Sequence, residues 1–203
     1  MVSLFPVSHM TVFSMLYCKK IKQFLIICLL ALSATPVLAG NSSLNVKSAE
    51  LESFEDGYVL NADVDAKFSN AIEEAVNRGF ELNFIFEFQL AKPRKYWFDD
   101  EVATTIHRVS LTYHALSRQY LVIRGDQQKT FVRLDEALDD LTYIHNLKVF
   151  QKSEVEKGEV YKAVFLMRLD TKKLPKSLQG ESISLDDWKL SSQRFEWTPN
   201  LFK

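Results

Sequence analysis

The sequence predicts a mainly β (α+β) fold, namely a single antiparallel, β-sandwich-like domain with two short helices. Two observations lead to this prediction. Apolar and polar residues alternate with a period of two over long stretches, and no strand–helix–strand rhythm runs through the chain. Such alternation is typical of antiparallel strands that bury one face and expose the other. A sandwich is favoured over a closed barrel, although the pattern fits both.

The predicted strands follow from this alternation and from turn signals between them. The alternation is strongest in 58–68, 82–90 and 161–169. Residues 46–54 precede the turn signal Glu55-Asp56-Gly57, which predicts a hairpin of the strands 46–54 and 58–68. Further strands are expected at 102–113, 120–124 and 188–197. The first two of these are joined through 114–119, and Pro199 stops the last one.

Two helices are expected between the strands. Ser69 or Asn70 caps the first helix, which ends at Gly79. Asp135 opens the second, which ends at Asn146 and carries an apolar face. That face consists of Leu134, Leu138, Leu141 and Ile144.

Residues 1–39 have the features of an export signal. Lys19, Lys20 and Lys22 precede the apolar run 24–34, and the segment ending at Ala39 has the pattern that a signal peptidase reads. The run is about half the ~20 residues that a membrane-spanning helix needs, so cleavage after Ala39 is preferred to an uncleaved anchor. If translation started at Met15, the basic segment before the apolar run would have a more ordinary length. Residues 1–14 would then not belong to the protein, and this alternative stays open.

Export places the mature domain, 40–203, in the periplasm. Cys18 and Cys28 both lie in the removed segment, so the mature chain has no cysteine for a disulfide. The removed segment carries three lysines and no acid, so its loss takes the formal charge from −1 to −4. This mild acidity gives no reason to expect nucleic acid as a partner.

The mature sequence shows no catalytic, metal or cofactor motif. It has no cysteine, no Gly-x-Ser-x-Gly elbow and no glycine cluster that could cradle a phosphate. The spacing of His107, His114 and His145 matches no metal-ligand pattern. Acidic residues are close together at Asp63 and Asp65 and again at 99–101. Each group has two interpretations, a solvated face of the domain or the carboxylate pair of a hydrolase.

The best candidate for a partner-binding site follows the strand 82–90. It comprises Arg94, Lys95, Tyr96, Trp97 and Phe98, together with Arg118 if the turn at 114–119 lies at the same end of the domain. Aromatic side chains and arginine are the residues favoured at interface hot spots. The alternative is that Trp97 and Phe98 fold back to plug the core, with Arg94 stacked on them. A second candidate is the basic loop 170–179, with a solvated connection as its alternative.

Several segments of the mature chain together resemble an exported bacterial family catalogued as domain of unknown function 4390. They are Asp56–Asp63, Ala71–Gly79, Lys92–Arg94 leading into Tyr96–Phe98, Leu111–Tyr120, Leu134–Leu138, Leu169–Thr171 and Leu174–Lys176. The resemblance covers essentially the mature chain and carries over no catalytic residue. It implies a partner in envelope signalling, a membrane sensor kinase of the nitrogen-regulation type.

We therefore expect a non-catalytic periplasmic protein that binds an envelope protein partner and has no stable membrane span after cleavage. The alternative is a periplasmic carrier of an apolar small ligand or lipid, which would use the space between the sheets. A hydrolase that uses the paired carboxylates is the third hypothesis.

The export signal gives a first testable prediction. The protein isolated from the cell envelope should begin at Gly40, because Ala39 ends the segment that the peptidase reads. Intact-mass spectrometry and sequencing of the first residues check this. A chain that retains Lys19 to Lys22 at its N-terminus would contradict cleavage and favour the anchor.

Overall fold

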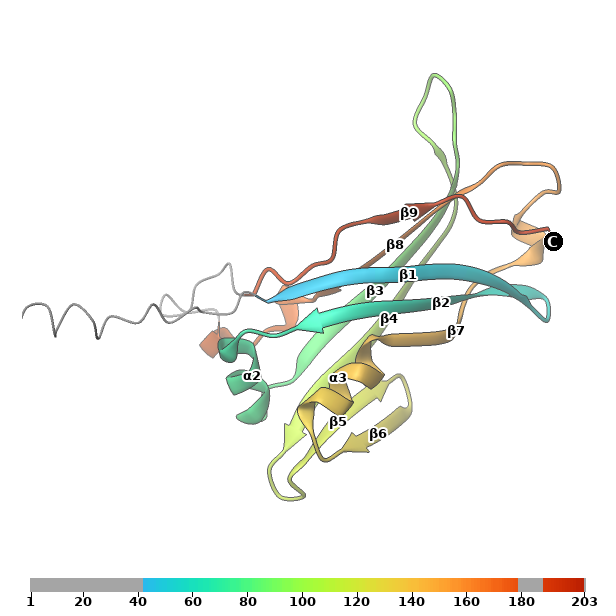
Figure 1. Ribbon diagram of the computed structural model, residues 1–203. Coiled ribbons are helices and arrows are strands. Elements are labelled where there is room, and N and C mark those ends of the chain that lie inside the picture. Colours follow the sequence, from blue (N-terminus) through green and yellow to red (C-terminus); the bar gives the residue numbers. More distant parts are fainter. Residues whose placement is uncertain (1–41, 179–187, 203) are drawn as a thin grey trace, which may run out of the picture. The chain divides into compact units, whose positions relative to one another are not determined.

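The computed structural model describes residues 42–178 and 188–202, which form two antiparallel sheets (Figure 1). The sheet with three strands has the order β1-β2-β7. Its strands are β1 (Ser43–Phe54), β2 (Gly57–Lys67) and β7 (Tyr143–Gln151). The predicted hairpin of the first two strands is confirmed, with Phe54 opposite Gly57 at its turn.

The sheet with six strands has the order β6-β5-β4-β3-β8-β9. Its strands are β3 (Leu82–Lys92), β4 (Asp100–His114), β5 (Gln119–Arg124), β6 (Gln127–Phe131), β8 (Lys162–Leu169) and β9 (Phe195–Trp197). The described elements also include the helices α2 (Asn70–Asn77) and α3 (Leu134–Thr142) and the 3-10 turns η1 (Lys152–Glu154), η2 (Thr171–Lys173) and η3 (Lys176–Leu178). Over these described residues the predicted fold class is confirmed: mainly β, antiparallel, with two short helices and no closed barrel.

The core lies between the two sheets and is rich in aromatic rings. Phe84, Phe88 and Phe165 are at most 1% exposed, because alternation turns them all to the inner face of the six-stranded sheet. Phe88 stacks on Phe150 of β7 with ring centroids 5.9 Å apart, which joins the two sheets directly. Tyr58 of β2 stacks on the same Phe150 at 4.8 Å. The centre of the core is therefore a column of rings contributed by three strands.

Both helices pack their apolar side chains against the sheets. Ser69 is the residue before the first turn of α2, as predicted, but its side chain makes no capping hydrogen bond. The chain leaves this helix through Gly79, whose φ of +85° is the left-handed conformation that favours glycine. Ala137 and Leu141 of α3 are fully buried.

The prediction was wrong about the end of the second helix and about the strand after it. The helix ends at Thr142 instead of Asn146, and β7 begins at once. Asn146 lies within β7 with a φ of 54°, where an irregularity in the pairing lets its backbone N–H donate to Asn61 Oδ1 at 2.9 Å. The alternation does not reveal β6 and β7, because their polar and apolar residues do not alternate cleanly with exposure.

The C-terminal third differs from expectation in two further places. The last strand covers only Phe195–Trp197, and an isolated bridge between Arg168 and Ser191 replaces the earlier part of the predicted strand 188–197. In the loop 170–179, the basic residues Lys172, Lys173 and Lys176 are exposed, as expected of a solvated connection, whereas Leu174 and Leu178 are buried against the core and anchor it. Gln179 lies outside the described residues.

The predictions for the N-terminal segment concern residues that the structure does not describe. The signal at 1–39, with Cys18 and Cys28, and the start at Met15 all lie there. In the part of the chain that is described, no helix has the length and apolar character needed to cross a bilayer.

Two phenylalanines test the position of the core. Phe88→Ala should lower the free energy of unfolding by about 3–5 kcal/mol, because it removes the ring that joins the sheets. Phe54→Ala, at a ring that is 46% exposed, should cost less than about 1 kcal/mol. Urea denaturation of both variants measures the difference, and equal costs would place the core elsewhere.

Candidate functional site

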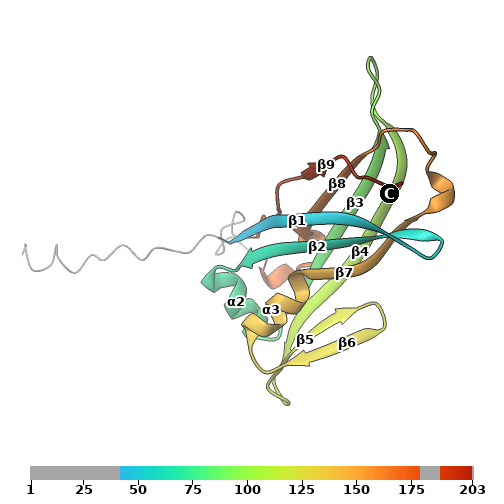
Figure 2. The same ribbon diagram turned by 45° about the vertical axis from the view of Figure 1, so that its right-hand side comes forward.

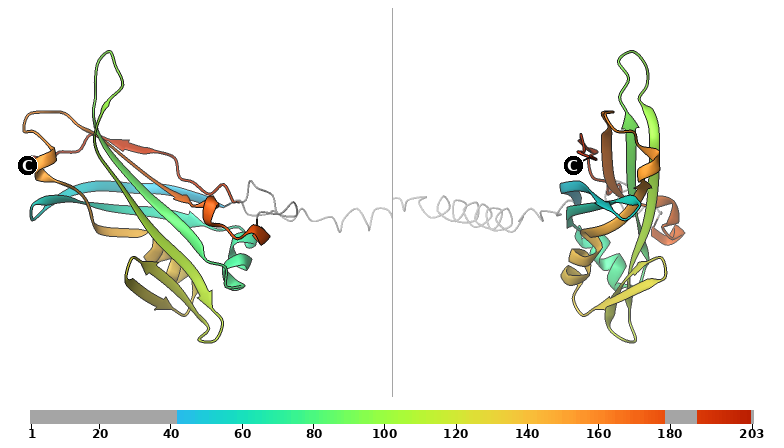
Figure 3. Two further views of the ribbon diagram at one scale, coloured as in Figure 1. Left: turned by 180° about the vertical axis from the view of Figure 1, so that it is seen from behind. Right: turned by 90° about the vertical axis from the view of Figure 1, so that its right-hand side faces the viewer.

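The predicted site residues lie at the tip of the β3–β4 hairpin. These two strands pair from Leu82 opposite Leu111 to Lys92 opposite Asp100, with one shift of register between Leu90 and Ala91. The connecting residues, 93–99, extend beyond the neighbouring strands β8 and β9, as Figures 1 and 3 show at the top of each view. Pro93 has no backbone N–H, so the ladder cannot continue through it. The hairpin thus carries its loop away from the core.

Three consecutive aromatic side chains of this loop are exposed. Tyr96 is 86% exposed, Trp97 76% and Phe98 87%. The ammonium group of Lys95 lies 5.5 Å from the centre of the Tyr96 ring. We call residues Arg94–Phe98 the aromatic loop. Its rings do not plug the core, so the alternative drawn from the sequence is wrong.

Ionic contacts fasten the base of the aromatic loop. The backbone N–H of Arg94 donates to Asp99 Oδ1 at 3.3 Å, and the Arg94 guanidinium pairs with Asp100 instead of stacking on the rings. Lys162 at the start of β8 lies 3.7 Å from Asp99. Asp99 and Asp100, which the sequence offered as catalytic acids, are thus each engaged by a cation.

Lys92 and Lys162 extend this network to the neighbouring elements. Lys92 Nζ lies 3.0 Å from Glu159, and this hydrogen bond raises the pKa of Lys92. Lys162 also lies 3.2 Å from Glu196 of β9. Each cation here faces a carboxylate, so little net charge is left at the base. The part of the loop that is free to make contacts is therefore the set of three rings and Lys95.

Arg118 does not belong to this site. It sits with a φ of 54° in the turn between β4 and β5, and β4 starts at the aromatic loop and ends at that turn. Fifteen residues of strand separate them, roughly 50 Å at the usual rise per residue. The turn has its own local order, with His114 Nδ1 3.0 Å from Ser117 Oγ. The predicted grouping of Arg118 with the aromatic loop is wrong.

The three histidines and the first acid pair do not come together either. His107 lies 3.3 Å from the Lys148 carbonyl, and the His145 ring stacks on Tyr143 at 5.9 Å. Asp63 and Asp65 share Lys47, at 3.9 Å and 3.5 Å. Over 42–178 and 188–202, no three of the side chains that could bind a metal converge.

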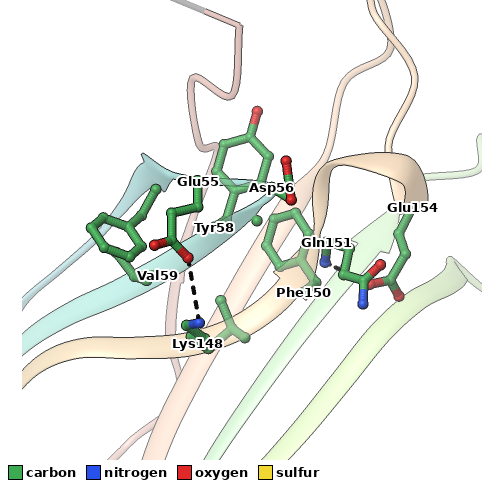
Figure 4. Close-up of a pocket in the computed structure, with 11 residues that line it drawn as sticks. Glu55, Asp56, Tyr58, Val59, Lys148, Phe150, Gln151 and Glu154 are labelled. Atoms are coloured by element: carbon green, nitrogen blue, oxygen red, sulfur yellow. Dashed lines mark hydrogen bonds and ion pairs between the residues drawn. The ribbon is translucent and has the colours of Figure 1, made fainter.

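A pocket of about 520 Å³ lies beside the β1–β2 turn (Figure 4). Two of its three acids are engaged, since Glu55 lies 3.7 Å from Lys148 and Glu154 accepts the Gln151 N–H at 2.6 Å. Gly57 lines it at a close approach of the strands, where a Cβ would lie 2.8 Å from the Phe150 carbonyl oxygen. Glu55 and Glu154 therefore already have partners in the chain.

Sequence reasoning found the aromatic loop but missed the residues that hold it. Lys162, Glu159 and Glu196 come from segments far along the chain from the loop. Alternating patterns reveal which residues share a face, and they do not show which loops meet at one end of a sheet.

A matched pair of tryptophans tests the exposure of the loop. Trp97→Ala should change the free energy of unfolding by no more than about 0.5 kcal/mol, because its ring makes few contacts with the protein. Trp188→Ala should cost about 3–5 kcal/mol, because that ring is only 2% exposed. Thermal and urea unfolding of the two variants measure these changes in the free energy of unfolding. A large loss from Trp97→Ala would restore the plug.

Comparisons with known proteins identify the family but no activity. No curated protein and no solved structure matches the chain. The family model described as Domain of unknown function (DUF4390) matches residues 41–198, which covers both sheets and the aromatic loop. The chain therefore belongs to the family of proteins with this domain of unknown function.

Proposed function

We propose that this protein is a non-catalytic periplasmic protein that binds a partner protein of the cell envelope through the aromatic loop. The observation that carries the proposal is the exposure of Tyr96, Trp97 and Phe98 at the tip of a projecting hairpin. Their exposed apolar ring surface is unfavourable in water, and the protein gains little packing from it, so their exposure needs a reason outside the isolated chain.

The area of the three rings suits an anchor. Aromatic side chains carry ~150–250 Å² each, so at exposures of 76–87% about 500 Å² stays in contact with water. That is comparable to the largest apolar patches of soluble monomers, of which many are functional. It is less than the ~800 Å² per partner of a standard interface. The loop should therefore enter a recess of the partner and be joined there by neighbouring residues.

The charge pattern at the base supports docking through the rings. Arg94, Lys92 and Lys162 are occupied by Asp100, Glu159 and Asp99. A partner would therefore meet a nearly neutral stem and would not need to supply a strong counter-charge. Rigid aromatic rings lose little conformational entropy on binding, which is why they dominate hot spots.

The family indicates which kind of partner to expect. Its implied association with envelope signalling points to the periplasmic part of a membrane sensor kinase. Export through the signal at 1–39 would bring the domain to that compartment.

The two other hypotheses have no comparable observation in their favour. A carrier that held its guest at the centre of the core would find no room, because Phe84, Phe88 and Phe165 fill the space there. A hydrolase would need free paired carboxylates, and Asp63 and Asp65 share Lys47. Both stay hypotheses behind the partner-binding proposal.

Crosslinking in living cells tests the proposal. A photoreactive phenylalanine analogue at position 97 should yield one discrete crosslinked envelope protein, because the ring at this position would lie in the partner's recess. The same analogue at Leu116, which is 92% exposed at the opposite hairpin turn, should yield none. A third probe at Asp63 controls for contacts on the face of β2.

The outcomes separate the classes of partner. A protein captured at 97 alone identifies the partner, and Tyr96→Ala with Phe98→Ala should then reduce its yield several-fold. Capture of lipid at 97, or equal capture at 97 and 116, would contradict a specific protein interface at this loop.

A further inference from the structure

A second site of a different chemical kind lies in a cleft between the two sheets, away from the aromatic loop. The cleft has a volume of about 500 Å³, within the range typical of small-molecule sites. Residues of β3 to β7 and the end of α3 line it, among them Phe86, His107, Arg124, Lys129, Asp140 and Tyr143. The β5–β6 hairpin lies on one side of the cleft, and α3 and β7 lie on the other. Figure 2 shows this hairpin beneath α3 and β7.

The floor of the cleft is apolar. Phe86, Val109 and Ile144 line it and are only 2–4% exposed, so they form a surface that is part of the main core. Such a floor favours an apolar or flat ligand body over a hydrated ion. It also gives the site a rigid base, because these side chains are fixed by their packing on both sheets.

One wall of the cleft carries the cations. Arg124 and Lys129 lie opposite Val109 and Val122 in the strand pairing, which turns both side chains to the inner face of the six-stranded sheet. Arg108 also lines the cleft, but alternation directs its side chain to the other face of β4, so we do not count it.

A single carboxylate, Asp140, holds both cations in place. The Arg124 guanidinium donates to a side-chain oxygen of Asp140 and to its backbone carbonyl, and Lys129 Nζ lies 2.6 Å from the other side-chain oxygen. These hydrogen bonds outweigh burial and lower the pKa of Asp140, so the carboxylate stays ionised. One negative charge cannot neutralise two positive ones. The cluster keeps a net positive charge, and Arg124 and Lys129 keep N–H groups beyond those used on Asp140.

The opposite wall belongs to β7, whose Ile144 and Leu147 line the cleft. Tyr143 lies opposite Asp63 in the strand pairing, whereas Ile144 lies opposite the buried Ala62. Alternation therefore directs the stacked rings of Tyr143 and His145 to the outer face of β7, so we do not count them. At one end, His107 lies 3.3 Å from the Lys148 carbonyl and Thr105 donates to the Val149 carbonyl, so side chains of β4 hold β7 there. The cleft therefore presents an apolar floor, a fixed positive cluster on one side and apolar side chains of β7 on the other.

We propose that this cleft binds a small organic anion, a molecule with an apolar or aromatic body and one carboxylate, sulfonate or phosphate group. The anionic group would meet Arg124 and Lys129, and the body would lie on Phe86 and against Leu147. A metal ion fits poorly, because Asp140 is already bonded to two cations and would face their repulsion of a third. The site is independent of the aromatic loop and does not rest on its proposed role.

Two dyes with the same ring system test this assignment. Anilinonaphthalene sulfonate carries an anionic group, and N-phenylnaphthylamine is its neutral counterpart. Fluorescence titration of the purified protein should show tighter binding of the sulfonate. Lys129→Gln should weaken sulfonate binding about ten-fold, as expected for the loss of one charge-assisted hydrogen bond, and leave the neutral dye unchanged. Lys129 is 60% exposed, so this change should not prevent folding.

The controls make the result decisive. Arg118→Gln removes the same charge at the distant β4–β5 turn and should leave both dyes unaffected. Leu147→Ala should weaken the sulfonate and the neutral dye alike, because it removes part of the apolar wall. Equal binding of the two dyes, or equal losses from Lys129→Gln and Arg118→Gln, would overturn the proposal. So would sulfonate binding that Lys129→Gln leaves intact.

Discussion

The structure depends on the pairing of β3 with its two neighbours. This strand lies in the middle of the six-stranded sheet, bonded to β4 on one side and to β8 on the other. Its inner face is Leu82, Phe84, Phe86, Phe88 and Leu90, all buried. Those rings meet β7 through Phe150 and also form part of the cleft floor through Phe86. The register that buries them leaves residues 93–99 without a paired strand, so the same constraint builds the core and projects the aromatic loop.

The two proposed sites handle charge in opposite ways. At the hairpin base, the cations of Arg94, Lys92 and Lys162 each meet a carboxylate, and the exposed rings carry no strong field. In the cleft, Asp140 is shared by two cations, and a positive charge is left over beside a buried floor. When a protein covers matched pairs, each charge that loses its water keeps its partner, so no uncompensated charge is buried. An unmatched cation beside apolar side chains attracts a small anion instead.

Sequence reasoning works here where the local pattern and the tertiary packing agree. The alternation in β2, β3 and β8 predicts which side chains face the core, because a two-residue period has only two faces. It fails at β7, where Asn146 takes a left-handed conformation and the pairing shifts, so the apolar residues lose their period. For the candidate site, the sequence alone shows the run of cationic and aromatic residues from Arg94 to Phe98. The sharing of Asp140 by Arg124 and Lys129 is not visible, because it depends on how α3 lies against the β5–β6 hairpin.

The shared strand β4 sets how the two sites relate. It begins at Asp100 in the base of the aromatic loop and reaches the cleft at His107, seven residues further on. At the usual rise this is roughly 23 Å, so a small anion in the cleft would not touch the residues of the aromatic loop. Any influence of one on the other would have to pass through a strand that is paired on both sides, and such a strand has little freedom to shift. The two sites should therefore bind independently, unless the partner is large enough to reach the cleft as well.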